Sequence, residues 1–439
     1  HVYRFHLRHG VRFHNGRTLE AKDVHDSLVR LLLPELSSAS SWIMREVRGA
    51  ADVIEGRTRT LSGIQVRDQH TVDIILDEPL AFFLSLLTMH EAAIIPAEEA
   101  RDPERFRLHP VGAGPFRLAE ATEGERVRVQ RNRDYYVPGI PHLDEVEFRL
   151  DLRSFRDVAE AFLRGEVDVA HGVPLKIVSD LRADPRIAPY MLTTIQLHTS
   201  YFGYDSTVAP FNRVEVRQAI NHAINRDRIN ERVFAGLGVV AKSLLPPGLL
   251  GYDANLRGIE HDPERARSLL RQAGVNGLRV EYRTWDTDEF NNSGQIPLII
   301  EDLAAIGIDV NVTMHSAVEA RKPLFKPGHG TFYCANWYAD FPDSDNFFYV
   351  FFHSDARSAR GLYFNSAAID AQIVEARRTN DPDRRAEIYK QLNQMVIREA
   401  PLATLFHERF FVLQKPEVRG LRTSLVPPPV RYHGTWIEE

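Results

Sequence analysis

The chain has 439 residues, 44% of them apolar and 26% charged, which is enough for roughly two to four domains with cores of their own. Its formal charge of −6 argues against a nucleic-acid-binding surface, because neutralising phosphates requires a basic excess. The one cysteine, Cys334, excludes an intramolecular disulfide and a cysteine-based zinc site. No apolar run approaches the roughly 18 residues that a membrane-spanning helix needs.

The first residues already follow a strand pattern, in which Val2, Phe5 and Leu7 alternate with polar residues until Gly10. Because the chain starts with His1 and not with methionine, we expect it to be truncated within a domain, with part of one sheet upstream. Any signal segment would also lie upstream, so its absence from this sequence is uninformative about location.

The patterns that follow alternate between helical and extended periods. The predicted helices are 19–33, 80–87, 155–163, 214–235, 263–273, 295–306, 345–352, 369–377 and 383–398. The predicted strands are 63–66, 71–76, 127–130, 146–150, 278–283 and 308–314. This mixture, with short connections, predicts an α/β protein of two or three mixed-sheet lobes.

Enzyme motifs are scarce in this sequence. It contains no G-x-S-x-G elbow, no H-E-x-x-H and no P-loop. Residues 112–115, Gly-Ala-Gly-Pro, superficially suggest a dinucleotide loop, but the proline and the missing third glycine do not fit a helix-opening phosphate cradle. We therefore interpret this segment as a tight turn that leads into a strand, and expect no cofactor.

Two groups of residues could suggest a metal site. Four histidines lie close together near the start, but their spacing does not place the imidazoles on one strand face, so exposed strand and turn positions are favoured; these are His1, His6, His9 and His14. Asp340, Asp343 and Asp345 could pass for part of a calcium loop, but a glycine at the sharp turn and a trailing glutamate are missing. We expect no metal.

The flank of that acidic cluster points to another kind of site. A strand that contains the aromatic residues Tyr333, Trp337 and Tyr338 ends at Asp340. A turn with Pro342 follows it. An aromatic wall beside one carboxylate suits an organic cation, because ring faces offer cation–π attraction and the carboxylate a counter-charge. The alternative is that Trp337 belongs to the core and Asp340 caps the helix 345–352. The residues alone favour neither interpretation.

Several segments, taken in chain order, resemble the bacterial extracellular solute-binding proteins of family 5, the peptide-, oligopeptide- and nickel-type receptors of ABC importers. The segments that carry this resemblance, which covers nearly the whole chain, are Tyr3–Gly16, Leu19–Val24, Ser62–Ile64, His109–Phe116, Asn132–Tyr136, Gly165–Asp168, Val216–Arg226 and Trp337–Asp343. One departure is Glu20, where the family usually has a threonine cap.

The resemblance implies a periplasmic-binding-protein-like fold of type II, with three lobes and a ligand cleft that closes by hinge bending. It places an accessory lobe at 1–108. The first ligand-binding lobe would comprise 109–203 with 406–439, and the second 204–405.

The same resemblance supplies the candidate ligand-binding residues. In peptide-binding members the aspartate of a W-x-x-D segment pairs with the α-ammonium of the ligand and the tryptophan walls a side-chain pocket, which implies these roles for Asp340 and Trp337. The chain departs from the family pattern at Cys334, where oligopeptide receptors have an arginine, and at Asp205, where asparagine is common; a turn or cap role is the alternative for Asp205. The full candidate set is Asp340, Trp337, Cys334, Asn336, Tyr201 and Asp205, although packing is the alternative role for Tyr201.

The resulting hypothesis is a non-enzymatic, periplasmic or membrane-anchored extracytoplasmic receptor. It would act as a monomer that captures a peptide or similar small polar solute, delivers it to ABC permease subunits and binds no nucleic acid. A second hypothesis is the ligand-sensing module of a cytoplasmic transcriptional regulator with a DNA-binding domain upstream. A third, a hydrolase, lacks an assembled nucleophile and base. The ligand could also be a sugar, an opine or a metal chelate.

Overall fold

The computed structural model describes residues 1–173, 175–285, 294–356 and 361–438. The chain divides into two compact units. Unit 1 comprises residues 1–171, 413–424 and 428–439, and unit 2 comprises residues 172–412 and 425–427. The boundaries of the three predicted lobes stay a prediction.

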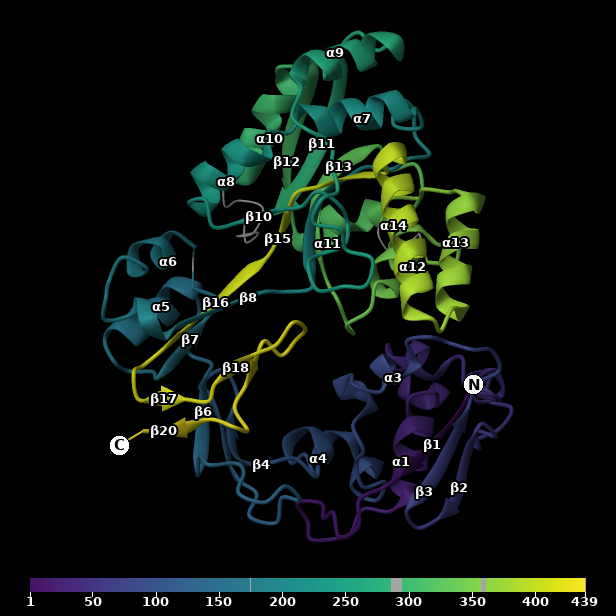
Figure 1. The fold of residues 1–439 in the computed structure, drawn as a ribbon, viewed down its shortest axis with the longest axis vertical. Helices are drawn as coiled ribbons and strands as arrows, with labels where there is room; N and C mark the ends of the chain where they lie inside the picture. Colours follow the sequence, from purple (N-terminus) through teal and green to yellow (C-terminus); the bar gives the residue numbers. More distant parts are fainter. Residues whose placement is uncertain (174, 286–293, 357–360, 439) are drawn as a thin grey trace. The chain divides into compact units, whose positions relative to one another are not determined.

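Unit 1 contains two antiparallel three-stranded sheets, in the orders β1–β3–β2 and β4–β5–β6 (Figure 1). Its strands are β1 Val2–His6, β2 Ile64–Asp68, β3 Thr71–Ile75, β4 Phe116–Thr122, β5 Arg126–Arg131, β6 Glu145–Arg149, β7 Val169–His171, β17 Val418–Arg419, β18 Arg422–Thr423, β19 Val430–Arg431 and β20 Trp436–Ile437. Its α-helices are α1 Ala21–Arg30, α2 Ala50–Ile54, α3 Phe83–Leu86, α4 Pro103–Leu108 and α5 Phe155–Leu163. The predicted helix 80–87 is thus only four residues long, because a turn in which the Phe83 N–H donates to the Leu80 carbonyl (3.1 Å) precedes it.

The glycine-containing segment of residues 112–115 is a turn that leads directly into β4, as the sequence predicts. The His14 ring contacts this turn at two points. Its Nδ1 accepts from the Gly112 N–H (3.2 Å), and its Nε2 lies 3.1 Å from the Gly114 carbonyl oxygen. Both ring nitrogens therefore have a structural partner. Among the described residues, no group of three or more histidine, cysteine, aspartate or glutamate side chains is arranged to hold a metal ion.

Unit 2 is built on a five-stranded mixed sheet in the order β12–β11–β13–β9–β14 (Figure 1). β11 runs parallel to β12 and β13, whereas β9 runs antiparallel to β13 and β14. The strands of the unit are β8 Met191–Ile195, β9 His198–Gly203, β10 Val239–Val240, β11 Leu278–Trp285, β12 Ile308–His315, β13 Thr331–Tyr338, β14 Leu402–Thr404, β15 Phe406–His407 and the start of β16 Arg409–Gln414. Its α-helices are α6 Leu175–Leu181, α7 Val214–Ala223, α8 Arg226–Phe234, α9 Pro263–Gln272, α10 Gln295–Ala304, α11 Ala317–Arg321, α12 Asp345–Phe352, α13 Ala367–Arg378 and α14 Pro382–Glu399.

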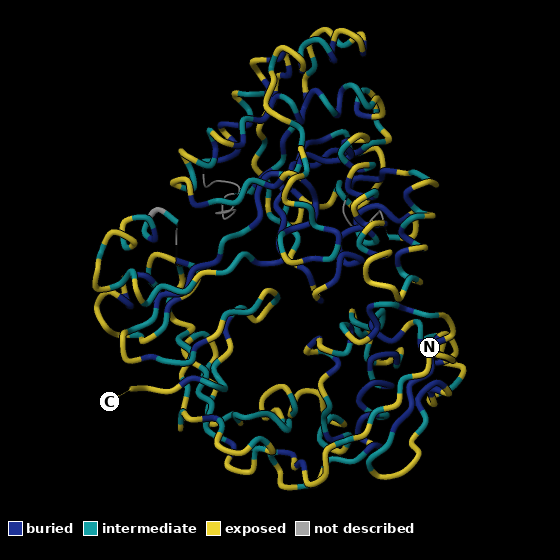
Figure 2. Tube along the Cα trace, viewed as in Figure 1, coloured by how far each residue is buried: buried dark blue, intermediate teal, exposed yellow. Residues whose placement is uncertain are grey.

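Two hydrophobic cores lie against this sheet. Helices α7, α9 and α10 contribute apolar side chains to one core, and α12, α13 and α14 contribute to the other. Successive residues of a strand point to opposite faces, so neighbouring residues of the central strands β9 and β13 enter different cores. Phe202 lies in the first core and Tyr201 in the second. Figure 2 shows the buried residues along the chain in dark blue, those of the central strands among them.

The prediction of one continuous helix over 214–235 is wrong, because the chain breaks between α7 and α8 at Ile224 and Asn225. The Asn225 side chain accepts from the Arg228 N–H (2.9 Å) and so caps α8, while the Asn225 N–H donates to Asp302 (2.8 Å). The Arg226 guanidinium donates to the Asn221 and Ile224 carbonyls at the end of α7, at 3.2 and 3.3 Å. The other predicted helices agree with the structure to within a few residues, and 155–163 and 345–352 agree at both ends.

Candidate functional site

The segment that carries the candidate residues is the end of β13 and the turn behind it. Along β13, Phe332 and Cys334 enter the core beside α7 and α10, whereas Tyr333 lies in the core beside α12 to α14, against which Trp337 packs. The Trp337 indole meets the Phe351 ring edge to face, at 6.2 Å between centroids. The strand ends at Tyr338, and Asp340 is exposed in the turn that follows.

One side chain, that of Asn346 in the first turn of α12, connects the tryptophan to this turn. Its Oδ1 accepts from the Trp337 Nε1–H (3.1 Å) and from the Asp340 N–H (2.9 Å), and its Nδ2 donates to the Asp340 Oδ2 (3.2 Å). The indole also donates to the Asn346 carbonyl (2.9 Å). Asp340 therefore does not cap α12, whose N-cap is Ser344. Indole and carboxylate are held side by side instead.

The turn is supported by two ion pairs, one buried and one partly buried. Arg385 of α14 donates to both oxygens of Asp343, at 2.7 Å each, and Arg377 of α13 donates to Asp345 Oδ2 at 2.7 Å. Arg385 also donates to the Tyr389 hydroxyl (2.9 Å) and the Ala376 carbonyl (2.9 Å). Two of the three aspartates that resembled a calcium loop, Asp343 and Asp345, thus pair with arginines of the fold.

Burial raises the pKa of the Asp345 carboxyl to about 7, an effect that the charge of Arg377 opposes and that of Asp343 reinforces. Asp345 is 3% exposed, and its Oδ1 has no hydrogen-bond partner among the described residues. The cluster is therefore a closed, desolvated support and not a surface for a solute.

Three of the other candidates are buried. Cys334 lies three positions before Trp337, which on a strand means the opposite face, and its Sγ accepts from the buried Gln295 Nε2 at 3.9 Å. Tyr201 is 2% exposed and packs against Tyr333 and Phe351. Neither side chain shares a surface with Asp340 in this structure.

Asp205 is fully buried and has the turn role that the sequence offered as the alternative. Its Oδ1 accepts from the Thr207 N–H (2.8 Å) and hydroxyl (2.6 Å), and its Oδ2 accepts from the Gly328 N–H (2.5 Å). The remaining candidate, Asn336, is half-buried on β13 opposite Ser200 of β9.

Sequence reasoning missed a polar group next to this segment. The Tyr338 hydroxyl donates to the Glu408 carboxylate, and its ring lies 4.3 Å from that of His198, the residue opposite it on β9. Burial raises the pKa of Glu408 and of Tyr338. His198 is 3% exposed, and neither ring nitrogen has a hydrogen-bond partner among the described residues. No local pattern could show this arrangement, because Glu408 lies 70 positions after Tyr338.

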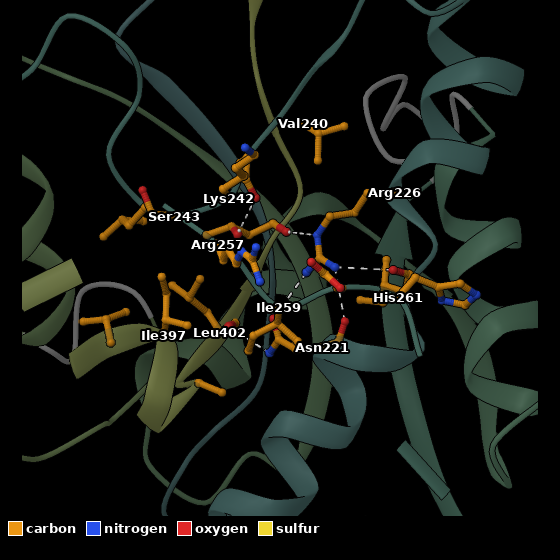
Figure 3. Close-up of a pocket in the computed structure, with 18 of the residues that line it drawn as sticks. Asn221, Arg226, Val240, Lys242, Ser243, Arg257, Ile259, His261, Ile397 and Leu402 are labelled. Carbon is orange, nitrogen blue, oxygen red and sulfur yellow. Dashed lines mark hydrogen bonds between the residues drawn. The ribbon is translucent and has the colours of Figure 1, made fainter. Parts of the chain in front are cut away.

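A hollow of about 310 Å³ also lies in unit 2, between α8, the segment 240–244, the loop 257–261 and the end of α14 (Figure 3). The Arg226 side chain, which is buried at this hollow, donates to the Thr404 carbonyl (2.6 Å) and to Asn221 Oδ1 (3.3 Å), in addition to the end of α7. Burial lowers the pKa of Arg226 to about 10, so the guanidinium stays charged at neutral pH. Its contacts join two helices to β14, a structural role. Among the described residues that line the hollow, none is a predicted site residue.

The fold is a mixed α/β fold of several sheets, and comparisons with known proteins identify the class of binding protein to which it belongs. The description "Bacterial extracellular solute-binding proteins, family 5 Middle" belongs to the family profile that matches residues 1–359. The chain is therefore a member of the bacterial extracellular solute-binding proteins of family 5, as its motifs indicate. Membership in a family of binding proteins supports a receptor over a hydrolase.

Three similar proteins illustrate the range of the family. Di/tripeptide-binding protein 2 of Pseudomonas aeruginosa (strain UCBPP-PA14) is 30% identical, over 96% of this chain and 81% of that protein. The periplasmic binding protein DppA from Helicobacter pylori, solved with the peptide STSA, is 27% identical with a TM-score of 0.81, over 100% of this chain and 86% of that one. AgaA from A. tumefaciens R10, solved with agropinic acid, is 26% identical with a TM-score of 0.77, over 100% and 87%. The predicted fold class is thereby confirmed. Within the described part of this chain, no helix is long and apolar enough to cross a membrane.

Replacing Arg385 by methionine should destabilise unit 2 by roughly 3–5 kcal/mol, because the Asp343 carboxylate would stay buried without its counter-charge. Arg384→Met is the matched control, since the neighbouring Arg384 makes an exposed ion pair with Glu375, and its loss should cost less than about 1 kcal/mol. Urea unfolding at pH 7 measures both values. Equal losses for the two variants would contradict a special role of the buried pair.

The buried histidines make the stability depend on pH. Burial lowers the pKa of His198 to about 3 and that of His407 to about 4, from an ordinary value of 6.5. Below pH 6.5 the unfolded chain binds protons that the folded chain does not, so this contribution to stability is present above pH 6.5 and lost as the pH falls. The free energy of unfolding of His198→Phe, relative to that of wild type, should therefore rise by on the order of 3 kcal/mol as the pH falls from 6.5 to 4. Urea unfolding across this range tests the prediction, and a difference between the variant and wild type that does not change with pH would contradict it.

Proposed function

We propose that this chain is the solute-binding receptor of an ABC importer and that its solute is a short peptide with an unmodified N-terminus. The relatives named for di- and tripeptide binding and the structure solved with a peptide support the ligand class. The receptor would work outside the cytoplasm, as a monomer with three lobes, and pass the peptide to membrane permease subunits.

The observation that carries the peptide assignment is the exposed Asp340 carboxylate beside the Trp337 indole. A carboxylate and an aromatic ring are complementary to a primary ammonium, which can form charge-assisted hydrogen bonds with the first and cation–π contacts with the second. Every unblocked peptide supplies such an ammonium at its N-terminus. Asp340 would thus recognise the shared part of the ligand, and not its sequence.

A second ligand class stays open because AgaA, at a similar level of identity, was solved with agropinic acid. The two classes differ in what they require of Asp340. An N-terminal ammonium depends on the carboxylate charge, whereas a solute recognised through other groups does not. One substitution therefore discriminates between them.

Asp340→Asn should weaken the binding of unblocked dipeptides and tripeptides by about 100-fold, equivalent to about 3 kcal/mol, because the isosteric amide retains shape and loses charge. Binding is measured by titration calorimetry with a panel of L-dipeptides and L-tripeptides, each also prepared with an N-acetyl group. Acetylation should weaken wild-type binding strongly and should have little effect on the variant.

Asp309→Asn serves as the control, since this exposed aspartate on the edge strand β12 makes an ion pair with Arg279 and lies on another strand of the sheet. It should bind peptides like wild type. If Asp340→Asn retains wild-type affinity for a peptide that wild type binds, the proposed recognition of the ammonium is wrong. If no member of the panel binds, the peptide class itself is wrong.

A further inference from the structure

Asn346 forms hydrogen bonds with both groups of the proposed site, the Trp337 indole and Asp340. It is 3% exposed, in a helix whose next residues, Phe347 and Phe348, are completely buried. The two residues that it bonds, Trp337 and Asp340, lie closer to solvent. A buried polar side chain with several well-made hydrogen bonds has one low-energy position, so the more accessible groups bonded to it are held as well.

The chemistry of the contacts requires an amide at this position. The Oδ1 faces two donors, the Trp337 Nε1–H and the Asp340 N–H, and the Nδ2 faces an acceptor, the Asp340 carboxylate. An ionised aspartate accepts only and an aliphatic side chain does neither, so asparagine supplies both functions at the same length. The three contacts also determine which end of the amide is oxygen.

We propose that Asn346 is a positioning residue for ligand recognition, which orients the Asp340 carboxylate and the Trp337 indole as one unit. The inference rests on the proposed function, because it assigns Asn346 to the recognition of the ligand ammonium. Asn346 acts through Asp340 and does not touch the ligand. Its loss leaves the carboxylate charge in place but lets the carboxylate leave the orientation that the ammonium needs.

The fixed orientation lowers the entropy that the binding site loses when a ligand arrives. For the carboxylate, this gain depends on the charge of Asp340, and this dependence distinguishes a positioning role from a general contribution to folding.

The test is a double-mutant cycle on the whole chain, with wild type, Asp340→Asn, Asn346→Leu and the double variant. The probe is the unblocked dipeptide that binds wild type most tightly in the panel described above, and affinity is measured by titration calorimetry. Asn346→Leu should weaken binding about tenfold. On the Asp340→Asn background the same substitution should cost clearly less, about threefold at most, because the carboxylate that it orients no longer carries charge and only its contact with Trp337 remains.

Asn393→Leu is the matched control, since Asn393 is 1% exposed in α14 and its Nδ2 donates to the Gly251 carbonyl at 3.5 Å. It removes a buried amide from the same unit without touching Asp340 and should leave affinity unchanged. Asn346→Ser, which keeps a small polar group near the start of α12, replaces the leucine variant if that fails to fold. It should show the same loss and the same dependence on Asp340.

The cycle separates the possible failures. Wild-type affinity of a folded Asn346 variant overturns the proposal, and so does a loss that persists undiminished on the Asp340→Asn background, because a purely structural effect is additive. If Asp340→Asn alone has no effect, the proposed function fails and the inference fails with it. If Asp340→Asn binds the peptide weakly, as expected, but Asn346→Leu binds it with wild-type affinity, only the inference fails.

Discussion

The arrangement of the candidate site depends on the buried ion pair between Asp343 and Arg385. Two charges taken out of water cost several kcal/mol each unless their geometry is excellent and their remaining donors are bonded. Here both carboxylate oxygens are paired, and the guanidinium also reaches Tyr389 and a backbone carbonyl. A fully bonded network of this kind is rigid, because moving any of its side chains would break hydrogen bonds in a buried site. It joins the turn after β13 to α14, and thereby determines where α12 begins and where Asn346 stands.

The candidate site combines a buried support with an exposed group, Asp340, for which we propose a role in recognition. Asp343 and Arg385 are buried, whereas Asp340 is exposed. A hydrated carboxylate costs little to maintain, and its desolvation arises only when a solute covers it. A solute that brings a cation offsets this cost, and one that does not is disfavoured. Selectivity of this kind needs no change in the support, which suits a family whose members bind chemically different solutes.

The sequence predicts the local elements well and the long-range contacts poorly. Helix α12 could be predicted to the residue, because a proline-containing turn and a dense aromatic run mark its start and extent. The break between α7 and α8 was missed, since the apolar period continues through it while Asn225 is held by Asp302, 77 positions away. The strand period could have separated Cys334 from Trp337, which lie an odd number of positions apart. No local pattern could show that Asn346 folds back on the preceding strand, because this contact needs the turn to be closed first.

The position of Cys334 has a practical consequence. The chain has one thiol, and it lies in a core beside α7 and α10, at 7% exposure. A buried, apolar thiol reacts slowly, and only when its surroundings open. The alkylation rate of Cys334 in the native protein therefore reports how often unit 2 opens around this residue. Because this thiol is buried, a cysteine introduced at the surface can be labelled selectively without altering the core.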